Sequence, residues 1–454
     1  MGTITLQQAA LWCGGKIDPK YSDVVFLGAN NDTRKLQPGE LFIALKGARD
    51  GHDFIDAAME KGAAAVLCNH CDGDYPAIVV EDTRLALGAI ARAERQRLGM
   101  KVVGVTGSVG KSTTKEMTAC VLESTYRVSK TPVNHNNDIG MPMAILSMPE
   151  DTQVAVLEMG MNHFREIAYL TDIAKPDVAV IINIGTMHIE HLGSMEGILK
   201  AKLEILEGLK EDGNVIFNGD DALLWEQRNN PDCQITYFGV KNEECQVRGK
   251  DVISIDGKLQ LRVQLADKEL PLEIPVEGEH FVPDILAAVC VGLALDVEPS
   301  AICRSLECFQ NMEGRQEIFQ AKGCTIIRDC YNAGPESMAA ALRVLGNKSG
   351  RRIAVMGDML ELGTCATAEH YKVGRVAAEN ADLIFAYGPH SNRLKHGAVT
   401  GGMSENCVFA FADDREALVK NLKQRAKAGD VLLFKGSRGM HMELALEAFL
   451  KEDQ

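Results

Sequence analysis

The sequence has few aromatic residues, a deficit of positive charge and no long apolar run. Aromatic residues make up only 5% of the 454 residues, whereas there are 42 glycines, a balance typical of α/β folds. Forty-eight Lys and Arg against 63 Asp and Glu give a net charge of −15, which argues against binding to nucleic acid or to an anionic membrane. No run approaches the roughly 18 apolar residues of a membrane-spanning helix. The first residues also lack the basic stretch and apolar block of a signal peptide.

The cysteines do not suggest a disulfide framework. There are 13 of them, an odd number scattered over a long acidic chain, which fits reduced thiols in the cytoplasm. Cys68 and Cys71 form a CxxC, but no second pair lies at zinc-ribbon spacing, so we interpret them as thiols in a surface turn. We therefore expect a cytoplasmic protein without membrane insertion.

Turn signals and hydrophobic periodicity divide the chain into three α/β units. Strands alternate with helical patterns from Lys101 onward, which predicts a parallel sheet covered by helices. The residues from Glu243 to Val276 change to short alternating strands and predict an antiparallel edge. At roughly 150 residues per domain, we place the three domains at residues 1–83, 84–311 and 312–454.

The most specific motif is TGSVGKS, residues 106–112, which follows the apolar strand Lys101–Val105. A Gly-rich loop lets backbone N–H groups surround a phosphate at a helix N-terminus. Lys111 would reach the β- and γ-phosphates and Ser112 would bind Mg²⁺. The spacing departs from the strict GxxxxGK[ST], because Val105 stands five residues before Gly110. A glycine turn without a ligand is the weaker interpretation, since the Lys-Ser pair is in place.

Two further strands end in polar residues that could meet this loop. Glu158 ends the strand Val154–Glu158 and could hold Mg²⁺ or a water at the carboxyl edge of the sheet, or simply cap a helix. The strand Val178–Ile182 is followed by Asn183 and His188, although a lone His is more often structural.

Two more segments are less specific. Lys202 lies in an amphipathic helical pattern, where the pattern alone favours a solvated lysine. Residues 131–142 form an amide-rich loop that suits recognition of sugar or phosphate oxygens, or merely connects two elements.

Together these motifs resemble those of the Mur ligases, the ATP-dependent amide ligases of bacterial peptidoglycan precursor synthesis. TGSVGKS matches the family's nucleotide loop, NHNNDIG its substrate loop, EMG its metal carboxylate and NIGTMHIEHLG its metal histidine. The likeness covers essentially the whole chain. It implies a small mixed α/β N-terminal domain that binds a UDP-sugar, a central P-loop-type parallel-sheet ATPase domain, and a C-terminal Rossmann-like α/β domain that binds the acceptor.

Motifs in the third unit favour one branch of this family. RDCYNAGPESM (328–338), GDMLELG (357–363) with His370 downstream, and KGSRGM (435–440) resemble members that add D-alanyl-D-alanine to a UDP-N-acetylmuramoyl-tripeptide. No Asn-Pro-Arg occurs, although relatives that add diaminopimelate or lysine usually carry it.

The resemblance also implies roles for individual residues, by their match to family motifs. Mg²⁺ would be held by Ser112, Glu158, His188 and a carbamoylated Lys202, and these with Lys111 would be the catalytic residues. The implied ATP-binding residues are Thr106, Gly107, Ser108, Val109, Gly110, Lys111, Ser112, Thr113, Arg315 and Asp329. The implied substrate-binding residues are Thr33, Arg34, Asp50, Gly51, His52, Asn134, Asn136, Asn137, Tyr331, Asn332, Ser437 and Arg438.

Two segments depart from the family pattern. HNxxN reads His280-Phe-Val-Pro-Asp284, and DDxYNANP reads Arg328-Asp-Cys-Tyr-Asn-Ala-Gly-Pro335. A carboxylate can only accept hydrogen bonds, so Asp284 would alter a contact with adenine. Alternatively, Asp284 serves the helix, because an acid in the first turn complements the dipole. We favour the ligand-facing interpretation slightly.

The implied reaction uses ATP to phosphorylate the terminal carboxylate of the tripeptide, and the amine of D-alanyl-D-alanine then attacks the acyl phosphate. We expect a monomer whose three domains close around the substrates. Alternatives are another amino-acid-adding ligase, a folylpolyglutamate-type ligase, or a nucleotide-binding protein without turnover. The sequence does not reveal whether the third residue of the tripeptide is diaminopimelate or lysine.

Overall fold

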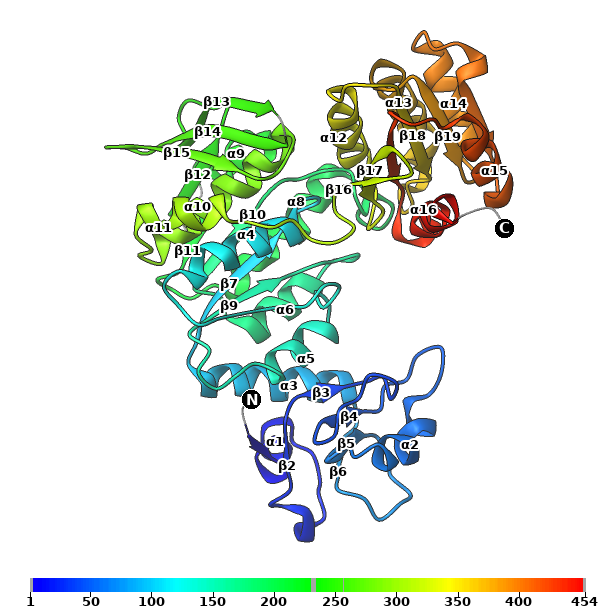
Figure 1. Ribbon diagram of the computed structural model, residues 1–454. Helices are drawn as coiled ribbons and strands as arrows, with labels where there is room; N and C mark the ends of the chain where they lie inside the picture. The colour runs from blue at the N-terminus through cyan, green and yellow to red at the C-terminus, as the bar shows by residue number, and fades with distance from the viewer. Residues whose placement is uncertain (1–2, 230–233, 256, 452–454) are drawn as a thin grey trace.

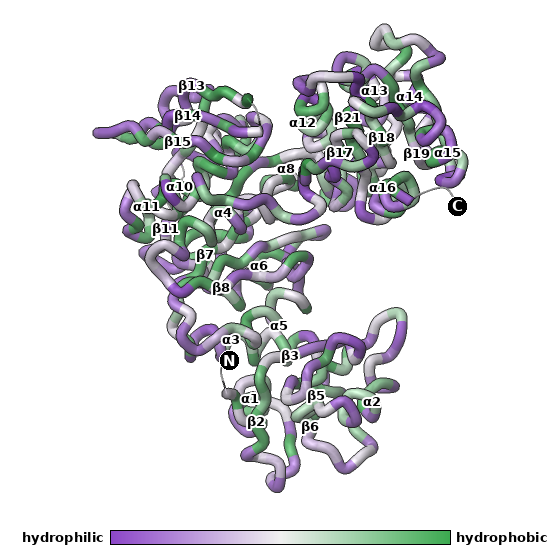
Figure 2. The backbone as a smooth tube through the Cα atoms, viewed as in Figure 1, coloured by the Kyte–Doolittle hydropathy of each residue, from purple (hydrophilic) through white to green (hydrophobic). Residues whose placement is uncertain are grey.

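The computed structural model describes residues 3–229, 234–255 and 257–451, and it contains three main sheets that follow one another along the chain (Figure 1). This confirms the predicted α/β class with three units. The apolar segments run along the strands in the middle of each unit, and hydrophilic segments form many of the outer loops (Figure 2).

The N-terminal unit has a parallel four-stranded sheet in the order β3-β4-β5-β6. Its strand β5 is buried along its whole length, as expected for a parallel strand covered on both faces. Cys68 ends this strand and is fully buried, so the surface-turn interpretation is wrong for Cys68. The elements are β1 (Ile4–Thr5), α1 (Leu6–Cys13), β2 (Val25–Phe26), β3 (Ala29–Asn30), β4 (Leu41–Ile43), α2 (Ile55–Glu60), β5 (Ala65–Cys68), β6 (Ala77–Val79) and α3 (Thr83–Leu98).

The central unit has a nine-stranded sheet in the order β15-β14-β13-β12-β11-β10-β7-β9-β8. Its first strands and connecting helices are β7 (Lys101–Thr106), α4 (Lys111–Glu123), β8 (Val128–Lys130), α5 (Gly140–Leu146), β9 (Val154–Glu158), α6 (Glu166–Ala174), β10 (Val178–Ile181), α7 (Ile189–Leu192) and α8 (Met195–Leu203). The remaining elements are β11 (Asn214–Asn218), α9 (Ala222–Trp225), β12 (Ile235–Gly239), β13 (Val247–Ile255), β14 (Lys258–Gln264), β15 (Glu269–Ile274), α10 (Val282–Ala294) and α11 (Pro299–Glu307). The antiparallel pairing of β13, β14 and β15 confirms the predicted antiparallel edge.

Register in the middle of this sheet positions the candidate site. Strand β7 lies between the parallel strands β9 and β10, with Val105 opposite Glu158 and Thr106 opposite Ile181. The loops that follow all three strands therefore emerge side by side at the carboxyl edge. Helices α4 and α10 pack against each other and contribute to one core, while α6 and α8 contribute to a second.

The C-terminal unit has a six-stranded sheet in the order β16-β17-β21-β18-β19-β20, antiparallel only between β16 and β17. The elements are β16 (Glu317–Ala321), β17 (Cys324–Asp329), α12 (Pro335–Gly346), β18 (Arg352–Gly357), α13 (Ala366–Asn380), β19 (Leu383–Tyr387), α14 (Ser391–Thr400), β20 (Val408–Phe411), α15 (Arg415–Arg425), β21 (Val431–Lys435) and α16 (Met442–Leu450). Consequently the last strand in sequence, β21, lies inside the sheet.

Helix α3 contacts α1 in the N-terminal unit and α5 and α6 in the central unit. The domain boundaries at residues 83/84 and 311/312 accordingly stay predictions. Among the described residues, none of the helices has the length and apolar character that crossing a membrane requires.

Candidate functional site

The predicted nucleotide loop joins β7 to α4 and is closed by a glycine that no other residue could replace easily. Gly110 has a φ of +87°, and a Cβ atom there would lie 2.5 Å from Oδ1 of Asp284. Both the left-handed backbone and the close approach of α10 therefore require glycine. Helix α4 begins at Lys111, so the loop ends at a helix N-terminus, where backbone N–H groups favour anions.

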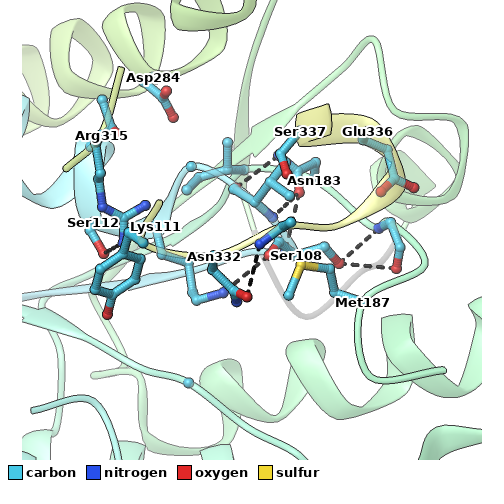
Figure 3. A pocket seen from close by; sticks show the side chains of 18 of the residues that line it. Ser108, Lys111, Ser112, Asn183, Met187, Asp284, Arg315, Asn332, Glu336 and Ser337 are labelled. Atoms are coloured by element: carbon cyan, nitrogen blue, oxygen red, sulfur yellow. Dashed lines mark hydrogen bonds between the residues drawn. The ribbon is translucent and has the colours of Figure 1, made fainter. Parts of the chain in front are cut away.

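Polar groups of the central unit satisfy this loop. Lys111 Nζ donates to the carbonyl oxygens of Gly107 (2.8 Å) and Ser108 (3.2 Å). Asn183 Oδ1 accepts hydrogen bonds from the backbone N–H groups of Ser108 and Val109, both at 3.0 Å, and its Nδ2 donates to Val109 O. Asn183 thus fixes the loop (Figure 3). The sequence places Asn183 directly after a strand at this edge of the sheet, but no motif predicts that it holds the loop.

Glu158 lies at the centre of a buried polar network. Its Oε2 accepts a hydrogen bond from Ser112 Oγ at 2.7 Å, and its Oε1 accepts one from Asn136 Nδ2 at 2.9 Å. Arg315 Nη2, from the C-terminal unit, donates to Ser112 Oγ at 2.7 Å (Figure 3). A hydroxyl from the start of α4, a carboxylate from the end of β9 and an amide from the loop before α5 therefore meet here, together with a guanidinium.

Lys202 is 1% exposed, so the interpretation as a solvated lysine is wrong. In the part of the chain that the structure describes, its side chain makes neither a hydrogen bond nor an ion pair. Burial, reinforced by the positive charge of Lys111, lowers the pKa of Lys202 well below its ordinary value. Burial also lowers the pKa of Lys111, which Glu158 partly opposes. The two lysines therefore disfavour each other's charged form.

His188 is held from outside its own unit. It has a left-handed φ of +66°, and its Nδ1 lies 2.8 Å from Oε2 of Glu361 in the C-terminal unit. This contact lowers the pKa of Glu361. The residues fit a Mg²⁺ site only as a mixed set: within the described residues, no three His, Cys, Asp or Glu gather where they could hold a metal ion. The oxygen donors that Mg²⁺ prefers would come from Ser112, Glu158 and a modified Lys202.

These residues surround a cavity of about 640 Å³ between the central and C-terminal units. The predicted residues that line it are Ser108, Val109, Gly110, Lys111, Ser112, Thr113, Asn134, Asn136, Asn137, Glu158, His188, Arg315, Asp329, Tyr331, Asn332 and Arg438. The predicted residues that do not line it are Thr106, Gly107, Lys202, Ser437, Thr33, Arg34, Asp50, Gly51 and His52. Further lining residues that the sequence did not single out include Glu336 and Arg343.

Asp284 lines this cavity, yet it also has a structural partner. Its Oδ1 accepts a hydrogen bond from Thr114 Oγ1 on α4 at 2.6 Å, and its side chain is buried. Burial raises the pKa of Asp284 to about 7. Asp284 therefore braces α10 against the nucleotide loop, a role that neither interpretation from the sequence included.

The C-terminal lining is ordered by its own contacts. Lys435 Nζ donates to Asp329 Oδ2 at 2.7 Å and to Asn332 O at 3.0 Å. The guanidinium of Arg315 lies 4.0 Å from the ring centre of Tyr331, whose hydroxyl donates to Asn134 Oδ1 in the central unit. The altered RDCYNAG segment thus still places Asp329, Tyr331 and Asn332 at the cavity.

The N-terminal segment lies apart from this cavity and satisfies its polar groups locally. Arg34 is exposed and pairs with Asp32 at 2.8 Å, while Asp50 Oδ1 lies 2.6 Å from His52 Nδ1. The ring of His52 stacks on His70 at 4.5 Å. A second cavity of about 350 Å³ lies where the N-terminal and central units meet, and none of the residues implied to bind substrate line it.

Comparisons with known proteins cover all three units. The chain matches family models described as Mur ligase family, catalytic domain (residues 26–95), Mur ligase middle domain (105–292) and Mur ligase, glutamate ligase domain (314–438). It is 40% identical to the UDP-N-acetylmuramoyl-tripeptide–D-alanyl-D-alanine ligase of Bacillus subtilis (strain 168), covering 95% of this chain and 94% of that protein.

Solved structures show the same likeness. A crystal structure of MurF from Acinetobacter baumannii aligns over 100% of both chains with a TM-score of 0.91 and 31% identity. MurF ligase from Thermotoga maritima in complex with ADP aligns over 94% of this chain and 97% of that chain, with a TM-score of 0.81 and 31% identity. With the domain models matched in order and relatives aligned over nearly the full length, the chain belongs to the Mur ligase family.

Proposed function

We propose that this chain joins D-alanyl-D-alanine to a UDP-N-acetylmuramoyl-tripeptide, with ATP cleaved to ADP and phosphate, in the cytoplasmic synthesis of peptidoglycan precursors. The observation that carries the proposal is the single cavity onto which the nucleotide loop, the amide loop and the C-terminal residues all open. The names of the aligned relatives give it independent support. We expect the protein to act as a monomer.

The residues divide the reaction between them. The backbone N–H groups at the start of α4 and the Lys111 ammonium would bind the phosphates of ATP, and Lys111 would leave its loop carbonyls to do so. Ser112, Glu158 and His188 would hold Mg²⁺, which neutralises charge on the transferred phosphoryl group when bound. Because Arg315 already donates to Ser112 Oγ, it is placed to meet the same phosphates.

The amide loop and the C-terminal unit would bring the two other substrates together. The carboxylate of the tripeptide attacks the γ-phosphorus, which gives an acyl phosphate and ADP. The dipeptide amine then attacks the acyl carbon, and the tetrahedral intermediate expels phosphate. The amides of Asn134 and Asn137 and the guanidinium of Arg438 line the cavity as donors for carboxylate or sugar oxygens. Orienting the substrates could supply several of the roughly 7–11 kcal/mol available from proximity.

We include in this proposal that Lys202 is carbamoylated. Its burial without a partner favours the uncharged amine, which is the form that adds to CO₂ and releases a proton. The product carries an anionic oxygen that suits Mg²⁺. Protein supplied with ¹³C-bicarbonate should show a carbamate carbon signal that is absent from Lys202→Ala. A wild-type protein without this signal would contradict the modification.

ADP release is the test of the function as a whole. Turnover should require ATP, the tripeptide nucleotide and D-alanyl-D-alanine together. Single amino acids and glutamate with a folate serve as alternative substrate sets. Turnover with one of those sets instead would identify another ligase of the family, and ATP binding without any turnover would favour a non-catalytic nucleotide-binding protein.

A further inference from the structure

The loop between β10 and α7 is enclosed by the C-terminal unit. Thr186 donates through both its backbone N–H and its Oγ1 to Glu336 Oε1, each at 3.1 Å. Gly334 lies so near this loop that a Cβ atom would be 2.8 Å from Sδ of Met187, and Figure 3 shows Met187 and Glu336 in the same view of the cavity. A Cβ on Gly363 would likewise lie 3.0 Å from Cβ of Glu190. We call the two carboxylate contacts, Glu336 with Thr186 and Glu361 with His188, the interdomain clasp.

The second contact of the clasp joins two residues with unusual backbones. His188 has a φ of +66° and Glu361 a φ of +63°, a left-handed conformation that is strained for residues other than glycine. Such strain persists only where the surroundings impose it. Nδ1 of His188 and Oε2 of Glu361 lie 2.8 Å apart. This Nδ1 is buried and has no aligned hydrogen-bond partner among the described residues, so the Glu361 carboxylate is the acceptor within its reach.

The strained loop that carries Glu361 is fixed by buried groups on both sides. His370 is fully buried, and its Nε2 accepts a hydrogen bond from the N–H of Met359 at 3.0 Å. Its Nδ1 must then carry the proton that is donated to Ala366 O at 2.7 Å. On the other side Ser437 Oγ accepts a hydrogen bond from the N–H of Leu360 at 2.9 Å. The GDMLELG segment, His370 and the KGSRGM segment therefore form one structure that presents Glu361.

We propose that Glu361 is a positioning residue for His188: its carboxylate accepts the Nδ1 proton of the imidazole when the C-terminal unit is docked, and this leaves Nε2 as the unprotonated ligand atom. A histidine that binds metal usually donates its other ring N–H to a carboxylate or carbonyl, which fixes tautomer and ring orientation. The importance of this contact for catalysis rests on the proposed metal role of His188. The 2.8 Å distance between His188 and Glu361 does not depend on that role.

One consequence is that the metal site is completed across a domain interface. His188 belongs to the central unit, whereas the group that orients its ring belongs to the C-terminal unit. Separation of the two units would return the imidazole to the tautomer it prefers without a partner. Docking of the C-terminal unit would therefore also set the tautomer and the orientation of the His188 ring.

The test uses the full-length protein without metal and reads the tautomer of His188 by ¹⁵N NMR of labelled histidine, with His188→Gln to assign the signal. The wild type should show a protonated Nδ1. Glu361→Gln keeps an acceptor oxygen and should keep this form. Glu361→Gly removes the carboxylate, so the Nδ1-protonated form of His188 should disappear. Because the left-handed φ at this position suits glycine, the melting temperature should not fall. Glu379→Gln, an exposed charge change on α13, is the matched control and should change nothing.

Titration with Mg²⁺ then separates this inference from the proposed function. Glu361→Gly should weaken Mg²⁺ affinity by about 10–100-fold, and Glu361→Gln should weaken it less. A Glu361→Gly protein that retains the Nδ1-protonated form overturns the positioning role. If the tautomer changes while Mg²⁺ affinity stays constant, the positioning role stands and the proposed metal role of His188 fails.

Discussion

The nucleotide loop and the interdomain clasp border the same cavity, but different parts of the chain hold them in place. The loop is fixed by neighbours within the central unit, above all by three hydrogen bonds from Asn183. The clasp depends on two partly exposed carboxylates from another unit. Interfaces between domains of one chain commonly allow relative motion. The comparison indicates that the phosphate half of the site is preorganised, whereas the half that orients His188 forms on docking.

Substitution of Lys111 should give the largest loss of activity, because its ammonium would bind the negatively charged phosphates of ATP. Lys111→Met should lower kcat at least about 10²–10³-fold, as for the loss of a single preorganised group. Its melting temperature should not fall, since burial already disfavours this ammonium. ADP release and thermal unfolding measure the two effects. Lys101→Met is the control, because Lys101 is an exposed lysine on β7, the strand that precedes the nucleotide loop. Activity of Lys111→Met within tenfold of wild type would contradict the role of Lys111.

The pKa of Asp284 provides a pH test of the preorganised half. Because burial raises this pKa to about 7, the folded state binds the proton more tightly than the unfolded state. The favourable contribution is complete below about pH 4 and is lost as the pH rises through 7. Asp284→Asn keeps an acceptor for Thr114. As the pH rises from about 4 to above 7, its free energy of unfolding should increase relative to that of the wild type by up to about 4 kcal/mol.

Urea unfolding at pH 4 and pH 8 measures this difference. At pH 8 the same substitution should also lower the KM for ATP, because it removes a negative charge from the nucleotide side. A stability difference that does not change with pH would contradict the proton uptake by Asp284. An unaltered KM would leave Asp284 with the bracing role alone.

Asn183→Leu should disrupt the loop without disturbing the clasp. It leaves the backbone N–H of Val109 without an acceptor, at a cost of about 1–3 kcal/mol, whereas the N–H of Ser108 keeps the backbone carbonyl of residue 183 as an acceptor. We expect a rise in the KM for ATP and a lower free energy of unfolding, with scattering of the unliganded protein unchanged. An increase in the radius of gyration would show that the interdomain clasp depends on the loop, which would contradict the distinction between the two regions.

Glu336→Ala should have the smallest effect on stability and the clearest effect on shape. It removes three hydrogen bonds across the interface, each worth at most about 0.5–1.5 kcal/mol, while each unit keeps its own core. Small-angle scattering should show a larger radius of gyration without ligand, and compaction with the tripeptide nucleotide and an ATP analogue. A radius that is the same in both states would contradict closure. Glu379→Ala is the matched control.

The sequence predicts the secondary structure elements better than it predicts the contacts of the site. The strand Val154–Glu158 has the bounds that the sequence predicts, and a helix begins directly after the Gly-rich loop as expected, because local patterns specify both elements. The meeting of the nucleotide loop with Glu158 also follows from strand topology. In contrast, the solvated interpretation of Lys202 failed because segments distant in sequence pack over this lysine and bury it, which a local helical pattern does not reveal.

The contacts that could not be predicted join residues far apart in sequence. Glu336 and Thr186 are 150 positions apart, and no local pattern marks either as a partner of the other. Asp284 contacts Thr114 across 170 positions, which depends on how α10 packs on α4. The N-terminal segment is a different case: its residues were implied only by resemblance, and their role in binding the nucleotide of the substrate stays a prediction.

The place of β21 has a consequence for how the protein is made. Strand β21 (Val431–Lys435) pairs with both β17 and β18, so during synthesis each of these two strands keeps one unpaired edge until residues 431–435 have been made. The first two units can fold much earlier, since domains generally fold in order as they emerge. Open strand edges invite pairing with other chains. A premature stop before residue 431 would therefore remove an inner strand of the C-terminal sheet and leave both β17 and β18 with an exposed edge.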